Sequence, residues 1–227
     1  MNFQHEKNVF CHFIKIVLLM TNFKLVKSKF KKTYLCGNKY FGMREKIHKA
    51  VEIMKEGGII LYPTDTIWGI GCDATNEEAI KKIYKLKKRV ETQSMLVLVE
   101  NERMLQNIVE VSSLAWDLID LSEKPTTIIY DDPKNVAKNI IAEDNTLGVR
   151  LIEPIFLKQL IGKLKSPIVS TSANISGAPS PRNFEDISED IKNGVDYILD
   201  IKVDSKTSKS SCIIKLTKDS KITIIRK

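Results

Sequence analysis

The stretch at residues 57–74 reads GGIILYPTDTIWGIGCDA, and it carries the strongest indications of the fold. The apolar run at residues 59–62 is typical of a buried strand. Gly57 and Gly58 predict the end of an amphipathic helix before it, because glycine is favoured just past a helix C-terminus. The polar run at residues 63–66 then leaves the strand as a loop. A helix, a buried strand and a polar loop therefore follow one another directly.

Helices and strands alternate on the C-terminal side of this stretch. The capping-box spacing at residues 75–78 predicts a helix to about Lys88. The rest of the pattern predicts helices near residues 101–107, 112–121 and 154–163, and strands at residues 95–99, 127–130, 147–151, 167–170, 196–199, 211–216 and 222–226. This mixture indicates one α/β or α+β domain. We predict the α/β class, with a twisted mixed sheet and flanking helices.

The positive charge of the chain is concentrated at its N-terminus. The 227 residues carry a formal net charge of +8, but residues 1–42 hold eight lysines and a single acid, Glu6. The remainder is nearly neutral, which weakens a basic-patch argument for nucleic-acid binding. The apolar segment at residues 9–20 is interrupted by Lys15 and is shorter than the roughly 20 residues of a spanning helix. We therefore predict no membrane association.

Two regions are expected from this contrast. Residues 43–227 would form the domain, since Met43 stands directly before an amphipathic helix. Residues 1–42 would be a basic extension that is poorly ordered or not translated. The alternative is a targeting segment, although no small-residue cleavage site follows its apolar part.

The cysteines and histidines exclude several kinds of site. The four cysteines, Cys11, Cys36, Cys72 and Cys212, form no C-x-x-C pair, and we expect isolated thiols in a reducing cytoplasm. His48 is the only histidine after residue 42. A Ser-His-Asp triad or a metal site made of protein side chains is therefore not expected.

Three polar segments border the predicted core elements. Two follow strands, PTDT at residues 63–66 and STSAN at residues 170–174, and the third is the helix end KKR at residues 87–89. Strand ends in such sheets point side chains into a shared crevice. Hydroxyls, an amide and cations suit a ligand with phosphate oxygens and a carboxylate. Each segment also has a purely structural alternative, which is a turn, a helix N-cap and a solvated helix end respectively.

Taken together, these segments resemble the YrdC family. Residues 57–74 resemble the opening signature of that family, and IYKLKKR at residues 83–89 is similar to its Lys-x-Arg helix end. GVR at residues 148–150, STSANISG at residues 170–177, Ser211 and Arg226 then follow in the family's order. The resemblance covers about residues 45–227. It implies a single YrdC-like domain, with a twisted sheet around a deep, positively lined cavity.

The resemblance also implies an activity. Members of the family convert L-threonine, bicarbonate and ATP, which carries Mg²⁺, into threonylcarbamoyl-AMP and pyrophosphate. A threonylcarbamoyl transferase partner then modifies tRNA, and tRNA itself is a further partner to consider. The resemblance thus implies that the chain is a nucleotidyltransferase. The carbamate oxygen can attack the α-phosphorus directly, so the scarcity of histidine is no obstacle.

The resemblance assigns site residues by position. Threonine would be held by Thr66, Arg150 and Ser211. ATP would be held by Lys87, Arg89, Thr146, Ser172, Asn174, Ser180 and Arg226, with Lys87 and Arg89 as the catalytic cations.

Some positions depart from the family's pattern. Thr92-Gln93-Ser94 stands where a Pro-containing stretch is common, and Lys124-Pro125 replaces a Gly-Pro turn. Ser210 and Cys212 replace a Pro and a Thr. None of these changes removes a charged group of the expected site. The alternative function is a non-catalytic module that binds double-stranded RNA or tRNA in its cavity.

Residues 1–42 should be dispensable for folding and activity. A chain that begins at Met43 should match the full chain in melting temperature and in threonine-dependent release of pyrophosphate, because residues 1–42 differ so clearly in composition from the domain. Thermal unfolding and a pyrophosphate assay on both chains would check this. A markedly lower melting temperature of the shorter chain would show that the extension packs on the domain.

Overall fold

The structure is a computed structural model that describes residues 42–90, 95–201 and 210–227. The chain divides into two compact units, Met1–Glu45 and Lys46–Lys227. Only residues 42–45 of the first unit are described, and they are helical. Residues 1–41 of the predicted extension and the unusual Thr92-Gln93-Ser94 segment thus lie outside the described residues, and what was predicted of them stays a prediction. Every helix in the described part of the chain is too short or too polar to span a bilayer.

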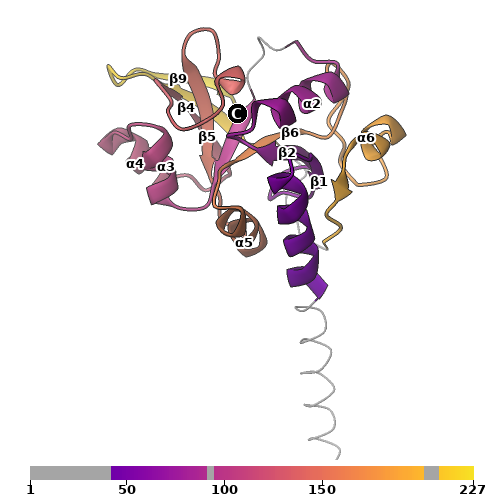
Figure 1. Cartoon of the computed structure of the whole chain (residues 1–227). Coiled ribbons are helices and arrows are strands. Elements are labelled where there is room, and N and C mark those ends of the chain that lie inside the picture. The colour runs from indigo at the N-terminus through magenta and orange to yellow at the C-terminus, as the bar shows by residue number, and fades with distance from the viewer. Residues whose placement is uncertain (1–41, 91–94, 202–209) are drawn as a thin grey trace, which may run out of the picture. The chain divides into compact units, whose positions relative to one another are not determined.

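A mixed sheet organises the second unit (Figure 1). Its described strands are β1 Ile60–Tyr62, β2 Gly69–Asp73, β3 Leu96–Val99, β4 Thr126–Asp131, β5 Thr146–Leu151, β6 Ile168–Ser172, β7 Tyr197–Ile198, β8 Cys212–Leu216 and β9 Ile222–Arg226. Their spatial order is β7-β1-β2-β6-β3-β5-β4-β8-β9. The β1–β7, β3–β5 and β4–β8 pairs are parallel, and the other described pairs are antiparallel. The predicted α/β class with a twisted mixed sheet is confirmed.

The helices begin where side-chain caps are available. Residues 42–55 are helical, and the further described helices are α2 Glu77–Lys87, α3 Glu102–Ile108, α4 Ser113–Asp120, the 3-10 helix η1 Lys138–Ile140, α5 Ile155–Leu164 and α6 Glu189–Gly194. Asn76, Asn101 and Ser112 accept the amide protons that open α2, α3 and α4. The hydroxyl and amide of Thr75 instead donate to Asp73. For this reason α2 begins one residue later than the capping-box pattern implied.

The strand register sorts side chains onto two faces of the sheet. Residues directly opposite each other on neighbouring strands share a face. One row of partners runs through Cys72, Val169, Val97, Val149 and Ile128, all of which belong to the main core cluster. Buried residues of α2, α3 and α4 complete that cluster. The buried side chains of α5 and of residues 46–55 lie outside this cluster.

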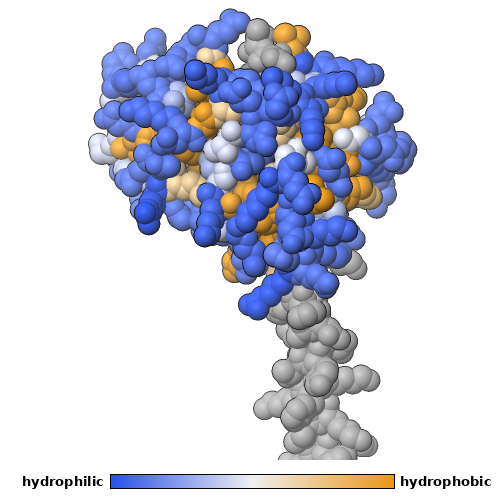
Figure 2. All heavy atoms as spheres, viewed as in Figure 1, coloured by the Kyte–Doolittle hydropathy of each residue, from blue (hydrophilic) through white to orange (hydrophobic). Residues whose placement is uncertain are grey.

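The outer surface carries mostly polar side chains. On the face seen in Figure 2, hydrophilic residues predominate and apolar residues are visible only in patches between them. The sheet ends at β9, whose residues Ile222, Ile224 and Ile225 are about half exposed. The buried part of the second unit therefore lies between the central strands and the helices, while β9 adds little to it.

Strand β2 was missing from the sequence prediction. Its sequence GIGCD holds two glycines, and glycine is depleted in strands. The structure explains Gly71. A Cβ atom at this position would lie 2.4 Å from the carbonyl oxygen of Val169 and 2.9 Å from Cε1 of Tyr62. The ring of Tyr62 crosses β2 over this bare backbone to reach Ser170 on β6, where the two hydroxyl oxygens lie 2.9 Å apart. The short helix α6 was also not predicted.

Gly71→Ala should destabilise the fold. Its new methyl group meets backbone on one side and a fully buried ring on the other, and such overpacking costs about 1–3 kcal/mol of unfolding free energy. Gly42→Ala is the matched control, since a Cβ there meets nothing within 4 Å. Urea denaturation of both variants would measure the effect. Equal midpoints for both variants and the parent protein would contradict this explanation of Gly71.

Candidate functional site

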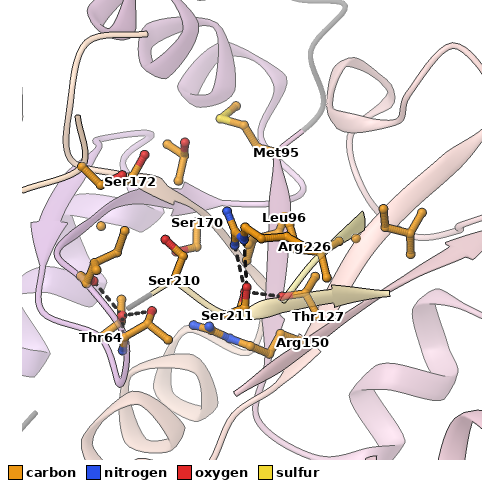
Figure 3. A pocket seen from close by; sticks show the side chains of 18 of the residues that line it. Thr64, Met95, Leu96, Thr127, Arg150, Ser170, Ser172, Ser210, Ser211 and Arg226 are labelled. Atoms are coloured by element: carbon orange, nitrogen blue, oxygen red, sulfur yellow. Dashed lines mark hydrogen bonds between the residues drawn. The ribbon is translucent and has the colours of Figure 1, made fainter. Parts of the chain in front are cut away.

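A cavity of about 250 Å³ lies on the face of the sheet opposite the core cluster (Figure 3). Its floor follows one row of register partners, Ser170, Leu96, Gly148 and Ile129. Gly69 and Gly148 also line it, and the lack of side chains at these positions keeps the floor recessed. The cavity is therefore built by the sheet itself and not by surface loops alone.

The charge of the cavity is positive. Arg89, Arg150 and Arg226 line it, whereas no aspartate or glutamate is among its described lining residues. Burial, and then the nearby guanidinium of Arg150, lowers the pKa of Arg226. Burial also lowers the pKa of Arg89. These shifts mean that cations lie partly out of water in this cavity, and an anionic ligand would stabilise them.

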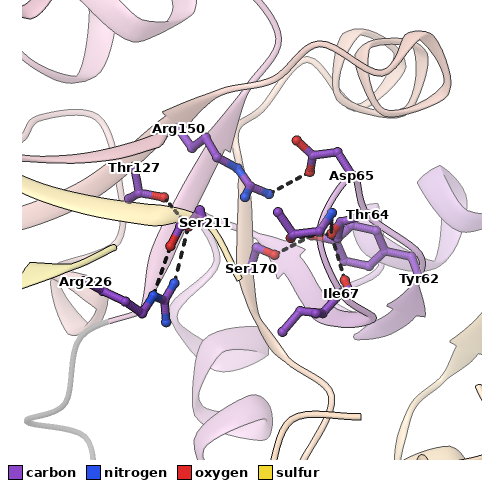
Figure 4. Close-up of polar contacts among 10 residues, drawn as sticks. Tyr62, Thr64, Asp65, Ile67, Thr127, Arg150, Ser170, Ser211 and Arg226 are labelled. Carbon is purple, nitrogen blue, oxygen red and sulfur yellow. Dashed lines mark hydrogen bonds and ion pairs between the residues drawn. The ribbon is translucent and has the colours of Figure 1, made fainter. Parts of the chain in front are cut away.

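Arg150 on β5 is the most deeply placed of these cations. Its side chain is 3% exposed, and its Nη2 donates to Oδ1 of Asp65 at 3.0 Å (Figure 4). Its Nε is buried and finds no hydrogen-bond acceptor among the described residues. A buried donor without a partner costs roughly 1–3 kcal/mol. The guanidinium therefore has an unused donor in the cavity wall, which a carboxylate could engage.

Ser211 lies on the same side of the cavity as Arg150 and connects strands β4, β8 and β9 (Figure 4). Its hydroxyl lies 2.9 Å from Oγ1 of Thr127 on β4. Arg226 on β9 donates from Nε to the carbonyl oxygen of Ser211 at 2.9 Å and from Nη2 to its hydroxyl at 3.4 Å. Arg226 is thus held beside the cavity by the residue that precedes β8, although β9 itself is exposed.

Lys87 is placed differently from the other predicted ligand residues. It is 1% exposed, does not line the cavity, and donates to the carbonyl oxygens of Ser172 and Asn174 and, at 3.4 Å, to Oδ1 of Asn174. Burial, and then the charge of Arg89, lowers its pKa to about 8. Asn174 is absent from the lining as well, and its Oδ1 accepts from the hydroxyl of Ser172. In this structure both residues hold the segment that presents Ser172.

The structure brings most of the predicted site residues together. The cavity is lined by Thr66, Arg89, Thr146, Arg150, Ser172, Ser180, Ser211 and Arg226. Five further hydroxyl residues line it that the sequence did not assign to the site, namely Thr64, Thr127, Ser170, Thr171 and Ser210. Thr64 and Ser170 lie within polar segments that the sequence already indicated. Thr127 had no such signal, because a single threonine in a strand pattern is ordinary.

Histidines and cysteines take no part in this cavity. The described residues contain no group of three or more His, Cys, Asp or Glu able to hold a metal ion. Cys72 and Cys212 are free thiols, while Cys11 and Cys36 lie outside the described residues. His48 is on the surface, 3.3 Å from Glu52. Hydroxyls and guanidinium groups are therefore what the site offers to a ligand.

Comparison with known proteins yields consistent matches. The Sua5/YciO/YrdC family model, described as "Telomere recombination", matches residues 52–227. The chain is 34% identical over 185 residues to a Methanocaldococcus jannaschii protein. That match covers 79% of this chain and 86% of the relative. It is 31% identical over 136 residues to the threonylcarbamoyl-AMP synthase of Hydrogenovibrio crunogenus. That match covers 58% of this chain and 73% of the relative.

Solved structures of P. abyssi Sua5 have the same fold. One matches with a TM-score of 0.70 at 26% identity, covering 79% of this chain and 55% of that one. A second, complexed with L-threonine, matches with a TM-score of 0.65, also at 26% identity, covering 75% and 50%. This chain thus spans about half the length of these Sua5 chains.

Lys87→Met should loosen the segment that Lys87 holds. The change removes the ammonium that bridges the carbonyl oxygens of Ser172 and Asn174, so the protein should lose a few kcal/mol of stability and bind ATP at least roughly tenfold more weakly. Lys85→Met, an exposed position of the same helix, is the control. Thermal unfolding and calorimetric titration with ATP would measure both effects. Unchanged ATP affinity would contradict this role.

The pH dependence of stability gives the same variant a second readout. The pKa of Lys87 falls from 10.5 to about 8 in the folded protein, so the unfolded chain binds more protons between these values. The contribution of Lys87 to the free energy of unfolding should therefore increase as the pH rises from about 8 to 10.5. This increase should be missing in Lys87→Met and present in Lys85→Met.

Proposed function

Since the chain belongs to the Sua5/YciO/YrdC family, we propose that it forms threonylcarbamoyl-AMP and pyrophosphate from L-threonine, bicarbonate and ATP. The name of the H. crunogenus relative and the threonine complex of P. abyssi Sua5 support this assignment. The product would serve threonylcarbamoyladenosine modification of tRNA in the cytoplasm, through a threonylcarbamoyl transferase partner. The chain would thus act as a nucleotidyltransferase.

One observation of the site carries the proposal. Arg150 is buried in the cavity wall. Its Nη2 is paired with Asp65, and its Nε has no acceptor among the described residues. A planar guanidinium with a free edge suits a carboxylate, which can accept two parallel hydrogen bonds. Two more guanidinium groups at the same cavity suit a polyphosphate. A ligand pair with one carboxylate and one triphosphate matches this arrangement.

The proposed reaction needs positioning more than it needs an enzyme nucleophile. The amine of threonine and bicarbonate combine into a carbamate with loss of water. A carbamate oxygen then attacks the α-phosphorus of ATP, its new bond to phosphorus forms, and the bond to pyrophosphate breaks. Arg150 and Ser211 would hold the amino acid beside the phosphates. Such positioning can supply several kcal/mol of the lowered barrier.

The remaining cations would stabilise the charge that develops on the leaving pyrophosphate. Arg89 and Arg226 line the cavity, as do the hydroxyls of Thr146, Ser172 and Ser180. Removing one well-placed donor of this kind typically lowers a rate roughly a hundredfold or more. Mg²⁺ carried on ATP would neutralise part of the phosphate charge. The hydroxyls and guanidinium groups of the cavity would hold the remaining phosphate oxygens.

The alternative, a module that binds double-stranded RNA or tRNA, fits the site less well. Phosphates of a duplex are reached by exposed lysines and arginines spread over a surface. Here Arg150 is recessed in a cavity of about 250 Å³, and the excess positive charge of the chain lies before residue 43. Pyrophosphate release that requires threonine, bicarbonate and ATP together would distinguish the enzyme, since a binding module would release none.

Arg150→Lys should impair threonine binding selectively. A lysine cannot make the bidentate contact, so we expect the affinity for threonine to fall at least roughly tenfold, with ATP affinity changed by less than about twofold. Arg103→Lys, an exposed position on α3, is the control. Separate calorimetric titrations with threonine and ATP would measure this. If both affinities fell equally, Arg150 would not hold the carboxylate.

A further inference from the structure

Two hydroxyls of the cavity wall, on Ser170 and Thr66, each contact another hydroxyl of the protein; Figure 4 shows the contact of Ser170 with Tyr62. The hydroxyl of Tyr62 lies 2.9 Å from Oγ of Ser170, and Oγ1 of Thr64 lies 2.8 Å from Oγ1 of Thr66. Each hydroxyl has a single proton to donate. Tracing where these protons go therefore shows what each wall residue can still offer to a ligand.

Tyr62 is the donor in its contact with Ser170. The side chain of Tyr62 is fully buried, and burial raises the pKa of its phenol far above the ordinary value, so the group stays protonated. A buried phenol proton requires an acceptor, and Ser170 Oγ provides it. The proton of Ser170 is consequently not used in this contact. Because Ser170 lines the cavity, it can donate that proton to a ligand.

Thr66 differs from Ser170, because its hydroxyl proton is already used within the protein. The hydroxyl of Thr64 donates its one proton to the carbonyl oxygen of Ile67 at 2.7 Å. The amide of Thr66 also donates to Thr64 Oγ1, at 3.0 Å. Thr64 has no second proton, so the short contact between the two hydroxyls uses the proton of Thr66. What Thr66 still offers to the cavity is lone pairs.

Ser170 and the threonine that holds Thr66 both approach Gly69. A Cβ atom at Gly69 would be 3.3 Å from Oγ of Ser170 and 3.4 Å from the methyl carbon of Thr64, the residue that holds Thr66. Gly69 itself lines the cavity. Ser170 with its free proton and Thr66 with its free lone pairs therefore line the same cavity, and the segments that carry them meet at Gly69.

We infer that Tyr62 is a positioning residue that makes Ser170 a hydrogen-bond donor in the cavity that Thr66 lines as an acceptor, so that this cavity selects a ligand hydroxyl. The inference rests on the proposed function. Among the polar groups of threonine, the hydroxyl both accepts and donates one hydrogen bond. Valine has a methyl group in its place and would leave the proton of Ser170 and the lone pairs of Thr66 unpaired in the bound state. Buried groups without partners disfavour such a substrate strongly.

Tyr62→Phe tests the inference, because it removes the phenol oxygen and keeps the ring that crosses Gly71. Ser170 would then turn its hydroxyl freely, and the preference for threonine over valine, measured as the ratio of their kcat/KM values, should fall roughly tenfold or more. The KM for ATP should change less than about twofold. Tyr130→Phe is the matched control, since Tyr130 is also buried but does not line the cavity, and the tyrosine bonded to Ser170 is Tyr62.

A double-mutant cycle separates positioning from a general structural role. If Tyr62 acts through Ser170, the Tyr62→Phe/Ser170→Ala double variant should discriminate no worse than Ser170→Ala alone. Additive losses, or an unchanged ratio in Tyr62→Phe, would overturn the inference. So would an equal loss for threonine and valine with a lowered melting temperature. If the parent protein releases no pyrophosphate with threonine, the proposed function fails and this inference fails with it, which is distinguishable from the other outcomes.

Discussion

The arrangement of the site depends on the absence of side chains at two positions of strand β2. Gly69 and Gly71 point to the same face, since residues two apart on a strand do so. Gly71 lets the ring of Tyr62 pass from β1 to Ser170 on β6, and Gly69 leaves open the space above the floor. Glycines usually weaken a strand. Here pairing with β1 on one side and β6 on the other holds β2 in place, so the strand tolerates them.

The same sheet separates stability from chemistry. On one face, rows of aliphatic register partners join α2, α3 and α4 in a continuous core. On the other face, the equivalent rows carry serines, threonines, glycines and Arg150, which leave the cavity polar and positive. A buried guanidinium would be strongly unfavourable alone, and the Asp65 carboxylate at 3.0 Å compensates part of its desolvation. The orphaned Nε shows that this compensation is incomplete without a ligand.

Sequence patterns predicted most elements, because apolar periodicity and caps are local features. They missed β2, whose glycines have a reason only once Tyr62 and Val169 are in place around them. Polar segments after strands, together with the family resemblance, indicated eight residues that do line the cavity. Lys87 shows the limit of such reasoning. In the sequence, a cation at a helix end resembles a ligand-binding group. Its burial against the carbonyl groups of Ser172 and Asn174 depends on tertiary structure and could not be predicted from the local pattern.

The position of Arg226 on β9 has a consequence for how the site comes into being. The cavity combines Thr64 and Thr66 with Arg226, so the groups that line it are separated by most of the chain. Contacts of such long sequence separation form late, because the loop-closure entropy must be lost before they can stabilise anything. During synthesis on a ribosome, the central strands can assemble while β8 and β9 are still emerging. The chain would thus reach a folded core before it gains the ability to bind a polyanion.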